Sequence, residues 1–189
     1  AILEAVSTAA ENFLTSSSWE NSLADVIARM GRATRASRVF VFETLQDIDH
    51  TWVSRLYNEW VAEGVSSEME QAGAHVHSFD SDGFERWEQV LGHGRILSGP
   101  VSEFPESERL YLEKIGVRSL VAAPIFVGQR WWGYIGLDDC LEERQWSPAE
   151  QDALRLAAGI LGAAIQRQQT EEVVKRLYET ERAQRQVSQ

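Results

Sequence analysis

Asp138, Asp139 and Cys140 are three consecutive side chains that could bind a metal ion or carry out nucleophilic chemistry, and they end the segment WWGYIGLDDC. This segment is typical of a strand, in which successive side chains point to opposite faces. Asp138 and Asp139 therefore point apart, and no histidine lies near them in sequence to complete a metal site. We expect a polar strand end. The alternative is that Asp138 accepts a hydrogen bond at the rim of a pocket.

Cys140 is the only cysteine of the chain. A cysteine nucleophile acts as the thiolate, and the acidic residues at 138, 139, 142 and 143 would raise the pKa of the thiol and disfavour that form. We therefore expect an unreactive thiol. A single cysteine also cannot form an internal disulfide, which fits a reducing compartment such as the cytoplasm.

His75 and His77 form a second candidate metal site. Residues two apart on an extended segment face the same side, so this pair could bind zinc together with Asp80 and Asp82. Histidines in a polar loop are usually solvated instead, and we predict no metal here.

Periodicity and capping residues predict the elements that position these side chains. Apolar residues at helical spacing predict helices at 1–14, 19–33, 84–92, 104–116 and 148–189. Short apolar or alternating segments predict strands at 38–45, 51–60, 95–99, 118–127 and 131–138. Segment 61–82 shows little periodicity, so we expect a long loop, and such loops are often functional. Pro124 indicates an edge position or a bulge within its strand.

Two helix starts carry capping boxes, in which a serine and a glutamate three residues later satisfy each other's backbone amides. Ser147 and Glu150 form one, with Pro148 at the first helical position. Ser17 and Glu20 form the other, ahead of helix 19–33.

The last predicted helix changes character along its length. Its first part has a buried seam, and Gly159 and Gly162 would let another element approach closely. The seam consists of Leu154, Ala158, Leu161 and Ile165. Val173 and Leu177 then belong to a weak heptad pattern that predicts a parallel coiled coil, able to rotate or shift register during signalling. The alternative is a solvated charged helix.

Length and composition suit one globular domain, with 189 residues and 43% hydrophobic content. The formal charge of −11 argues against partners that are themselves polyanionic, such as nucleic acid or an acidic membrane surface. No apolar run reaches the roughly 18 residues needed to cross a bilayer. We find no secretory signal pattern and expect a cytoplasmic location.

The order of elements predicts an α+β fold with an antiparallel sheet. Three segments resemble the GAF family of small-molecule sensor domains: RATRASRVFVFE (32–43), SLVAAPIFVGQRWWGYIGLDD (119–139) and WSPAEQDALRLAAGILGAAIQR (146–167). The likeness covers about residues 1–167, and 168–189 would be a coiled-coil linker to an output domain. The resemblance implies a central sheet with the terminal helices on one face and, on the other, a pocket roofed by the irregular middle segment.

The aromatic residues of the middle segment have two interpretations, which are compatible. They could form a satellite core under a long loop, or they could line the pocket that the resemblance implies, together with a few polar groups. The candidate ligand-binding residues are Glu43, Asn58, Trp60, His77, Phe79, Phe84, Trp87, Phe104, Trp132 and Asp138.

The identity of the ligand and of any cofactor stays unknown at this point. Bilin-binding relatives usually attach the chromophore to a cysteine of the middle segment, and residues 61–116 contain none, which argues against a covalent bilin there. Haem is an alternative, because some relatives bind it. The five-residue signature of cyclic-nucleotide-binding members is not evident, and members that reduce methionine sulfoxide need several cysteines.

We therefore predict a non-catalytic sensor domain that binds an unidentified small molecule and forms a homodimer through its terminal helices. The last helix, with Leu161, Ile165, Val173 and Leu177, would relay the state of the pocket to an output domain such as a histidine kinase or a diguanylate cyclase. The alternative is a structural dimerisation module with an empty pocket. An enzyme is poorly supported, because there is no Walker-type phosphate loop, nucleophile elbow or nucleophile–base pair.

Overall fold

A six-stranded antiparallel sheet forms the centre of the computed structural model, which describes residues 2–70 and 76–187. Its strand order is β3-β2-β1-β6-β5-β4. The strands are β1 (Arg38–Gln46), β2 (Trp52–Val61), β3 (Val76–Ser78), β4 (Leu97–Pro100), β5 (Ser119–Val127) and β6 (Arg130–Asp139). The expected α+β fold with an antiparallel sheet is confirmed.

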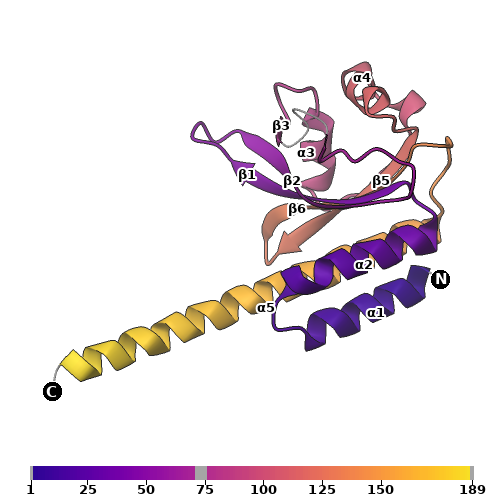
Figure 1. The fold of residues 1–189 in the computed structure, drawn as a ribbon. Coiled ribbons are helices and arrows are strands. Elements are labelled where there is room, and N and C mark those ends of the chain that lie inside the picture. Colours follow the sequence, from indigo (N-terminus) through magenta and orange to yellow (C-terminus); the bar gives the residue numbers. More distant parts are fainter. Residues whose placement is uncertain (1, 71–75, 188–189) are drawn as a thin grey trace.

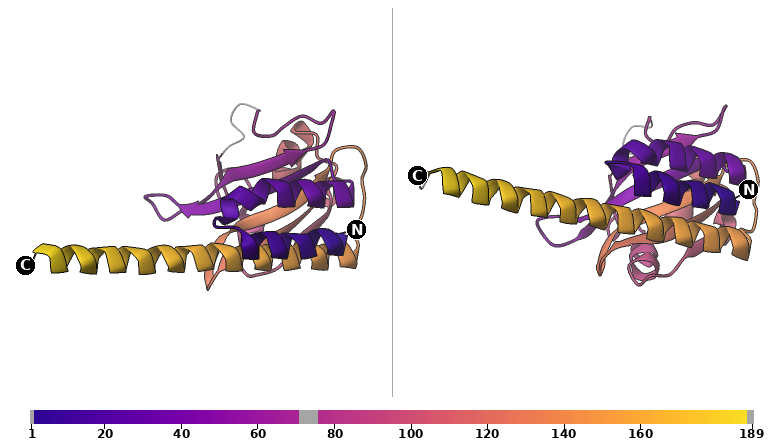
Figure 2. Two further views of the ribbon diagram at one scale, coloured as in Figure 1. Left: turned by 60° about the horizontal axis from the view of Figure 1, so that its bottom comes forward. Right: turned by 90° about the horizontal axis from the view of Figure 1, so that it is seen from below.

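Helices cover both faces of this sheet (Figure 1). Three long helices pack on one face: α1 (Ile2–Thr15), α2 (Trp19–Thr34) and the first part of α5 (Pro148–Val187). The opposite face carries α3 (Glu85–Leu91), a short 3-10 helix (Val101–Glu103) and α4 (Glu106–Lys114). Figure 2 shows α1, α2 and α5 running side by side in front of the strands.

The sheet separates two hydrophobic cores, because side chains alternate between its faces. The helix-side core includes Leu23, Ile27, Val41, Ile135 and Leu154 with their buried neighbours. The second core lies between the sheet and helices α3 and α4, and we call it the cavity-side core because a cavity lies within it. It is rich in aromatic rings and includes Phe40, Phe42, Trp87, Leu112 and Tyr134.

The elements predicted from sequence are present, with ends that differ by at most two residues where the chain is described. One prediction was incomplete: segment 61–82 contains β3, which pairs with β2 and extends the sheet. Three residues are too short to show a period in sequence. Pro124 does lie at an open edge, because β4 pairs with β5 only over Ser119–Ala122.

The capping box of α5 is confirmed. The backbone amide of Glu150 donates to Ser147 Oγ at 3.2 Å, and the Ser147 amide donates to Glu150 Oε2 at 2.8 Å. The box predicted at Ser17 is wrong, because Ser18 is the residue that precedes α2 and its side chain does not cap the helix. The Ser18 hydroxyl donates to the Glu20 carboxylate instead.

β2 and β6, the two strands beside β1, each contain a β-bulge. On one side of each bulge the side chains occupy the opposite face from the one that regular alternation predicts. In β2, Val41 is opposite Asn58 and Phe42 is opposite Leu56, which leaves Tyr57 as the extra residue. An extra residue reverses the alternation of side chains along the rest of the strand. In β6 the extra residue is Trp132, because the partners of Ile125 and Phe126 in β5 are Gly133 and Trp131.

Because of these bulges, Trp60 and Trp132 do not face the pocket, and their prediction as pocket residues is wrong. Both indoles belong to the helix side of the sheet. Trp60 packs so closely on Gly31 of α2 that a Cβ there would lie 2.1 Å from its ring. Trp132 meets Trp19 edge-on, with ring centroids 5.7 Å apart.

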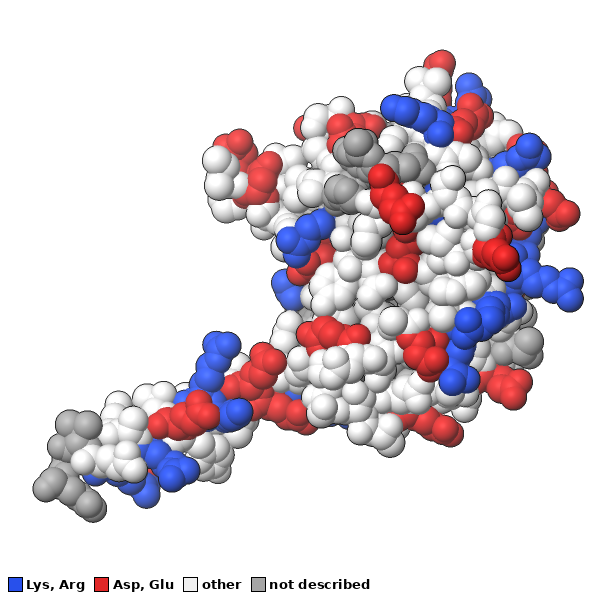
Figure 3. Space-filling model, in the orientation of Figure 1, with Lys and Arg blue, Asp and Glu red and all other residues white. Residues whose placement is uncertain are grey.

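Helix α5 is buried over its first part and then leaves the domain (Figures 1 and 2). Leu161 and Ile165 are buried in the helix-side core. The buried seam predicted for this part of the helix is confirmed, and because these residues face the sheet of their own domain they do not also contact a partner copy. Val173 and Leu177 are 54% and 65% exposed. Figure 3 shows charges of both signs along the protruding part, where Arg185 pairs with Glu181 one turn away.

Gly162 lies where α5 crosses β5, and a Cβ there would sit 2.2 Å from the Phe126 carbonyl oxygen. We expect Gly162→Ala to lower the free energy of unfolding by about 1–3 kcal/mol, because the helix must move off the strand. The matched control is Gly159→Ala, since a Cβ at Gly159 meets nothing within 4 Å. That change should raise stability by about 0.5–1 kcal/mol through helix propensity. Urea unfolding followed by circular dichroism measures both, and equal shifts would contradict the close approach.

Candidate ligand-binding site

A cavity lies on the cavity side of the sheet, between β1, β2, β6 and helices α3 and α4. Its volume is about 40 Å³, enough for roughly three water molecules. Ligand pockets for drug-sized molecules are about ten times larger. Its lining is Phe40, Phe42, Ser54, Glu68, His77, Phe79, Phe84, Trp87, Tyr111, Leu112, Ile115, Val117, Leu120, Tyr134 and Asp138.

Five of the ten residues proposed from sequence line this cavity: His77, Phe79, Phe84, Trp87 and Asp138. They come from β3, the turn that follows it, α3 and the end of β6. Whether they bind a ligand stays a prediction.

The other five lie elsewhere. Trp60 and Trp132 are on the helix side, as described above. Glu43 pairs with Arg55 at 2.6 Å near the surface. Asn58 is half-buried beside the β2 bulge, outside the cavity lining. Phe104 belongs to the cavity-side core, with the Arg86 guanidinium 4.7 Å above its ring.

Five aromatic rings of the lining form a closed circuit. Successive centroids are 6.2 Å apart from Phe42 to His77, 6.0 Å from His77 to Phe84 and 5.3 Å from Phe84 to Trp87. The circuit closes through Tyr134, which is 5.8 Å from Trp87 and stacks on Phe42 at 5.1 Å. The Tyr134 hydroxyl, whose pKa is raised by burial, donates to Ser54 Oγ at 3.2 Å.

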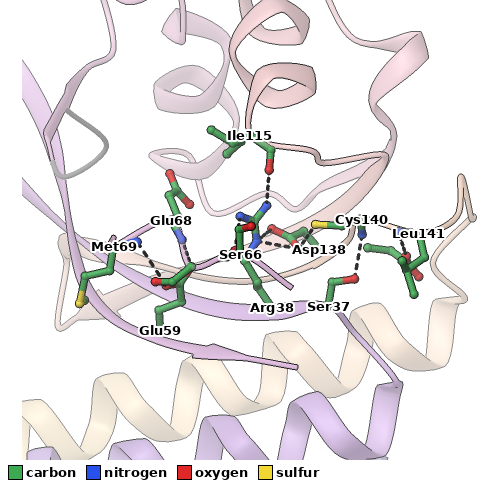
Figure 4. A network of polar contacts seen from close by, with 12 residues as sticks. Ser37, Arg38, Glu59, Ser66, Glu68, Met69, Ile115, Asp138, Cys140 and Leu141 are labelled. Carbon is green, nitrogen blue, oxygen red and sulfur yellow. Dashed lines mark hydrogen bonds and ion pairs between the residues drawn. The ribbon is translucent and has the colours of Figure 1, made fainter. Parts of the chain in front are cut away.

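Asp138, at one end of the cavity lining, belongs to a buried ion pair with Arg38. Figure 4 shows this pair and its neighbours. Arg38 is the first residue of β1 and Asp138 the last but one of β6, and antiparallel pairing places them directly opposite each other. Arg38 Nε donates to both Asp138 oxygens, at 2.9 and 3.2 Å. Its Nη1 and Nη2 donate to the carbonyls of Ser66 and Ile115, at 3.3 and 3.2 Å. Every nitrogen of the guanidinium is therefore engaged.

Burial shifts the titration of both partners. It raises the pKa of Asp138 to about 7, although the Arg38 charge opposes this shift. Burial lowers the pKa of the Arg38 guanidinium, but the surrounding negative charges, chiefly that of Asp138, together outweigh burial and raise this pKa. Burial, reinforced by Asp138, raises the pKa of the Cys140 thiol to about 11. The direction agrees with an unreactive cysteine, since little thiolate exists near neutral pH.

A second polar group lies beside the ion pair and links the middle segment to α4. The Tyr111 hydroxyl donates to Glu68 Oε1 at 3.0 Å and lies 3.1 Å from His77 Nε2. Glu68 is buried, and its carboxylate is 3.8 Å from the same histidine nitrogen. Glu59 of β2 holds this segment in place by accepting the backbone amide of Glu68 at 2.9 Å and that of Met69 at 3.3 Å (Figure 4).

Glu108 joins α3 to α4 above the cavity. Its two oxygens accept hydrogen bonds from Arg86 Nε and Nη2, at 2.8 and 2.6 Å. Trp87 Nε1 donates to the same carboxylate at 3.0 Å. The Glu108 side chain is 1% exposed, so this group fixes one wall of the ring circuit by a buried charge-assisted network.

Across the described residues, no group of three or more His, Cys, Asp and Glu side chains is arranged to hold a metal ion. His75 of the candidate zinc site lies outside the described residues. His77 faces Tyr111 and Glu68 rather than Asp82, whose carboxylate accepts the backbone amide of Ser78. None of the helices in residues 2–70 and 76–187 is long and apolar enough to cross a membrane.

Sequence reasoning missed three residues of the polar groups at the cavity: Glu68 and Tyr111, which line it, and Arg38, which pairs with Asp138 from behind the lining. Arg38 carried one usable signal, because an arginine that begins an otherwise apolar strand needs a buried partner. Its partner Asp138 is 100 positions away, and only the strand register brings the two together. Glu68 and Tyr111 carried no signal, since both occupy segments with many polar residues.

A sequence model of the GAF domain matches residues 18–165. The chain belongs to the GAF family. A similar protein is the methanogenesis regulatory histidine kinase FilI of Methanothrix harundinacea (strain 6Ac), 34% identical over 169 residues. The match covers 89% of this chain and 19% of FilI. The circadian input-output histidine kinase CikA of Synechococcus elongatus is 30% identical over 84 residues, covering 43% of this chain and 11% of CikA.

Solved structures with the same fold include the phycoerythrobilin-bound GAF domain from a cyanobacterial phytochrome. Its TM-score is 0.74 at 17% identity, covering 91% of this chain and 98% of that one. The blue-light absorbing form of the Thermosynechococcus elongatus PixJ GAF domain has a TM-score of 0.66 at 23% identity, covering 81% of this chain and 88% of that one. At these identities the likeness establishes the fold alone.

Proposed function

We propose that this GAF domain is the non-catalytic, cytoplasmic ligand-sensing part of a signalling protein, and that α5 relays the state of its cavity to an output domain. The observation that carries the proposal is the continuity of α5, which is one helix from Pro148 to Val187. Its first part belongs to the helix-side core and its last part leaves the domain. The chain is similar to the histidine kinase FilI and spans only 19% of it. In that relative, the rest of the protein lies outside the matched part, and this supports an output domain of the kinase type.

The contacts of β5 give the relay a physical route. One face of β5 supplies Leu120 and Ala122 to the cavity-side core, and the other supplies Val121 and Ile125 to the helix-side core. Helix α5 packs directly on this strand at Gly162. A ligand that binds two arrangements of the cavity with different affinity would therefore bias the position of α5, by no more than that difference in affinity.

Two contacts tie α5 to the N-terminal helices where it leaves the domain. Arg167 Nη2 donates to the Phe13 carbonyl at 2.7 Å, and Gln168 Oε1 accepts the backbone amide of Trp19 at 3.1 Å. We propose that the domain ends here, with residues 1–167 as the sensor and 168–189 as a coiled-coil linker. The three helices would then move as one unit at the start of the linker.

The proposed homodimer forms through the exposed heptad positions Val173 and Leu177. We expect the unmodified chain to sediment as a dimer and Val173→Asp/Leu177→Asp to sediment as a monomer, because two buried charges would face their copies across the seam. Lys175→Asp is the matched control, since it adds a negative charge on the outer side of the same helix. Analytical ultracentrifugation checks this. A monomeric unmodified chain, or a control that dissociates as fully as the double variant, would contradict the seam.

The second candidate function is a structural dimerisation module, and the small cavity favours it. The solved neighbours named above include a bilin-bound domain. Here about 40 Å³ cannot accept a bilin or a haem, and residues 61–116 offer no cysteine. Mass spectrometry of small molecules released by denaturation separates the two functions. A dimer that releases none, and whose melting temperature is unchanged by a metabolite panel, would favour the structural module.

A further inference from the structure

The charge of the cavity lining is acidic. Among its described residues are two carboxylates, Glu68 and Asp138, and no lysine or arginine. Arg38 balances Asp138 from behind. Glu68 receives a hydrogen bond from the neutral Tyr111 hydroxyl, and the side chain that pairs with it is His77, at 3.8 Å. A buried carboxylate is stabilised by a nearby positive charge, so the lining favours a cationic guest over an anionic one.

The ring circuit described above reinforces this preference. The face of an aromatic ring is electron-rich and attracts a cation within about 6 Å of its centroid. The five centroid separations lie between 5.1 and 6.2 Å. For a flat circuit with such sides the centre lies about 5 Å from each centroid, inside that range. A cation in the cavity would therefore lie close to Phe42, Phe84, Trp87 and Tyr134 at once.

The volume restricts the guest to a few non-hydrogen atoms, since about 40 Å³ corresponds to roughly three water molecules. Arg38 is not part of the described lining, and each of its nitrogens already donates to Asp138, Ser66 or Ile115, so it is poorly placed to receive an anion. A neutral molecule of the same shape would gain the apolar contacts without the attraction of the rings or of Glu68.

We infer that the cavity binds a small organic cation of the size of a methylated or short-chain alkylammonium ion, with Glu68 as its counter-charge and the ring circuit as its cage. The inference rests on the proposed ligand-sensing function and adds the chemical class of the ligand. It concerns the cavity alone, so it does not depend on the dimer or on the relay through α5.

Isothermal titration calorimetry of the unmodified chain tests the class with four probes that share a branched shape and the same number of non-hydrogen atoms. Trimethylammonium and isopropylammonium are the cations, isopropanol is the neutral match and acetate is the anion. Such small probes bind in the submillimolar to millimolar range at best. We expect at least one cation to bind about tenfold or more tightly than isopropanol, and acetate not to bind.

Glu68→Gln removes the charge and keeps an acceptor for Tyr111, so we expect it to weaken cation binding by about tenfold or more and to leave isopropanol unaffected. Glu63→Gln, an exposed position in the same segment, is the matched control. Isopropanol or acetate binding as tightly as the cations would overturn the inference while leaving ligand sensing intact. Absence of cation binding would also overturn it, and the release experiment described under the proposed function would then decide whether the cavity holds any ligand.

Discussion

Replacing Arg38 with methionine is expected to lower the free energy of unfolding by about 3–5 kcal/mol, because it leaves a buried carboxylate without its partner. Arg38 is 0% exposed, and the Asp138 side chain that it contacts is 2% exposed, so water cannot replace the guanidinium. The carbonyls of Ser66 and Ile115 would lose their donors as well. Urea unfolding followed by circular dichroism provides the measurement.

The comparison for this change is Arg55→Met. Arg55 pairs with Glu43 at 2.6 Å, but its side chain is 51% exposed, and such pairs contribute about 1 kcal/mol or less. The double change Arg38→Met/Asp138→Leu should recover much of the loss, because it removes the stranded charge. A loss for Arg38→Met no larger than that for Arg55→Met would refute the argument.

The loss caused by Arg38→Met should also depend on pH. Burial raises the pKa of Asp138 to about 7, and removing the opposing Arg38 charge raises it further. A carboxyl whose pKa is raised in the folded state favours folding once it is protonated, so the variant recovers stability as the pH falls. The difference in the free energy of unfolding between the unmodified chain and Arg38→Met is therefore expected to shrink as the pH falls from 8 to 5. A difference that grows over that range has the wrong sign.

The second large effect is expected at Glu108. Glu108→Ala should lower the free energy of unfolding by about 2–4 kcal/mol, because Arg86 and Trp87 Nε1 lose a shared buried acceptor. Arg86 is 36% exposed, which keeps the loss below that of a fully buried pair. Glu113→Ala is the control on the same helix, since that side chain is 55% exposed and 3.5 Å from Arg109. Similar losses for both variants would show that the network contributes little.

Most of the fold was predictable from sequence because local rules determine it. The capping box at Ser147 fixes the start of α5, and the apolar segments at 38–45 and 118–127 identify central strands. The face of the sheet that residues beyond a bulge occupy was not predictable. Tyr57 and Trp132 resemble ordinary strand residues, and only their pairing with β1 and β5 shows that each is inserted.

The candidate site was predictable only where neighbouring residues carry the pattern. Phe84 and Trp87 share the face of a short helix, and both line the cavity. The ion pair between Arg38 and Asp138 depends on strand order, and the approach of Glu68 to Tyr111 depends on the path of a segment without periodicity. Such contacts between distant segments need the assembled fold.

The position of the two bulges gives the protein a natural pair of optical reporters. Trp52, Trp87 and Trp131 lie on the cavity side of the sheet, whereas Trp19, Trp60, Trp132 and Trp146 lie on the helix side. Indole fluorescence responds to the immediate surroundings of each ring. A variant that keeps only one of these two sets would therefore report by fluorescence on one side of the sheet alone. Changes at the cavity and changes at the terminal helices could then be timed separately, without attaching a dye.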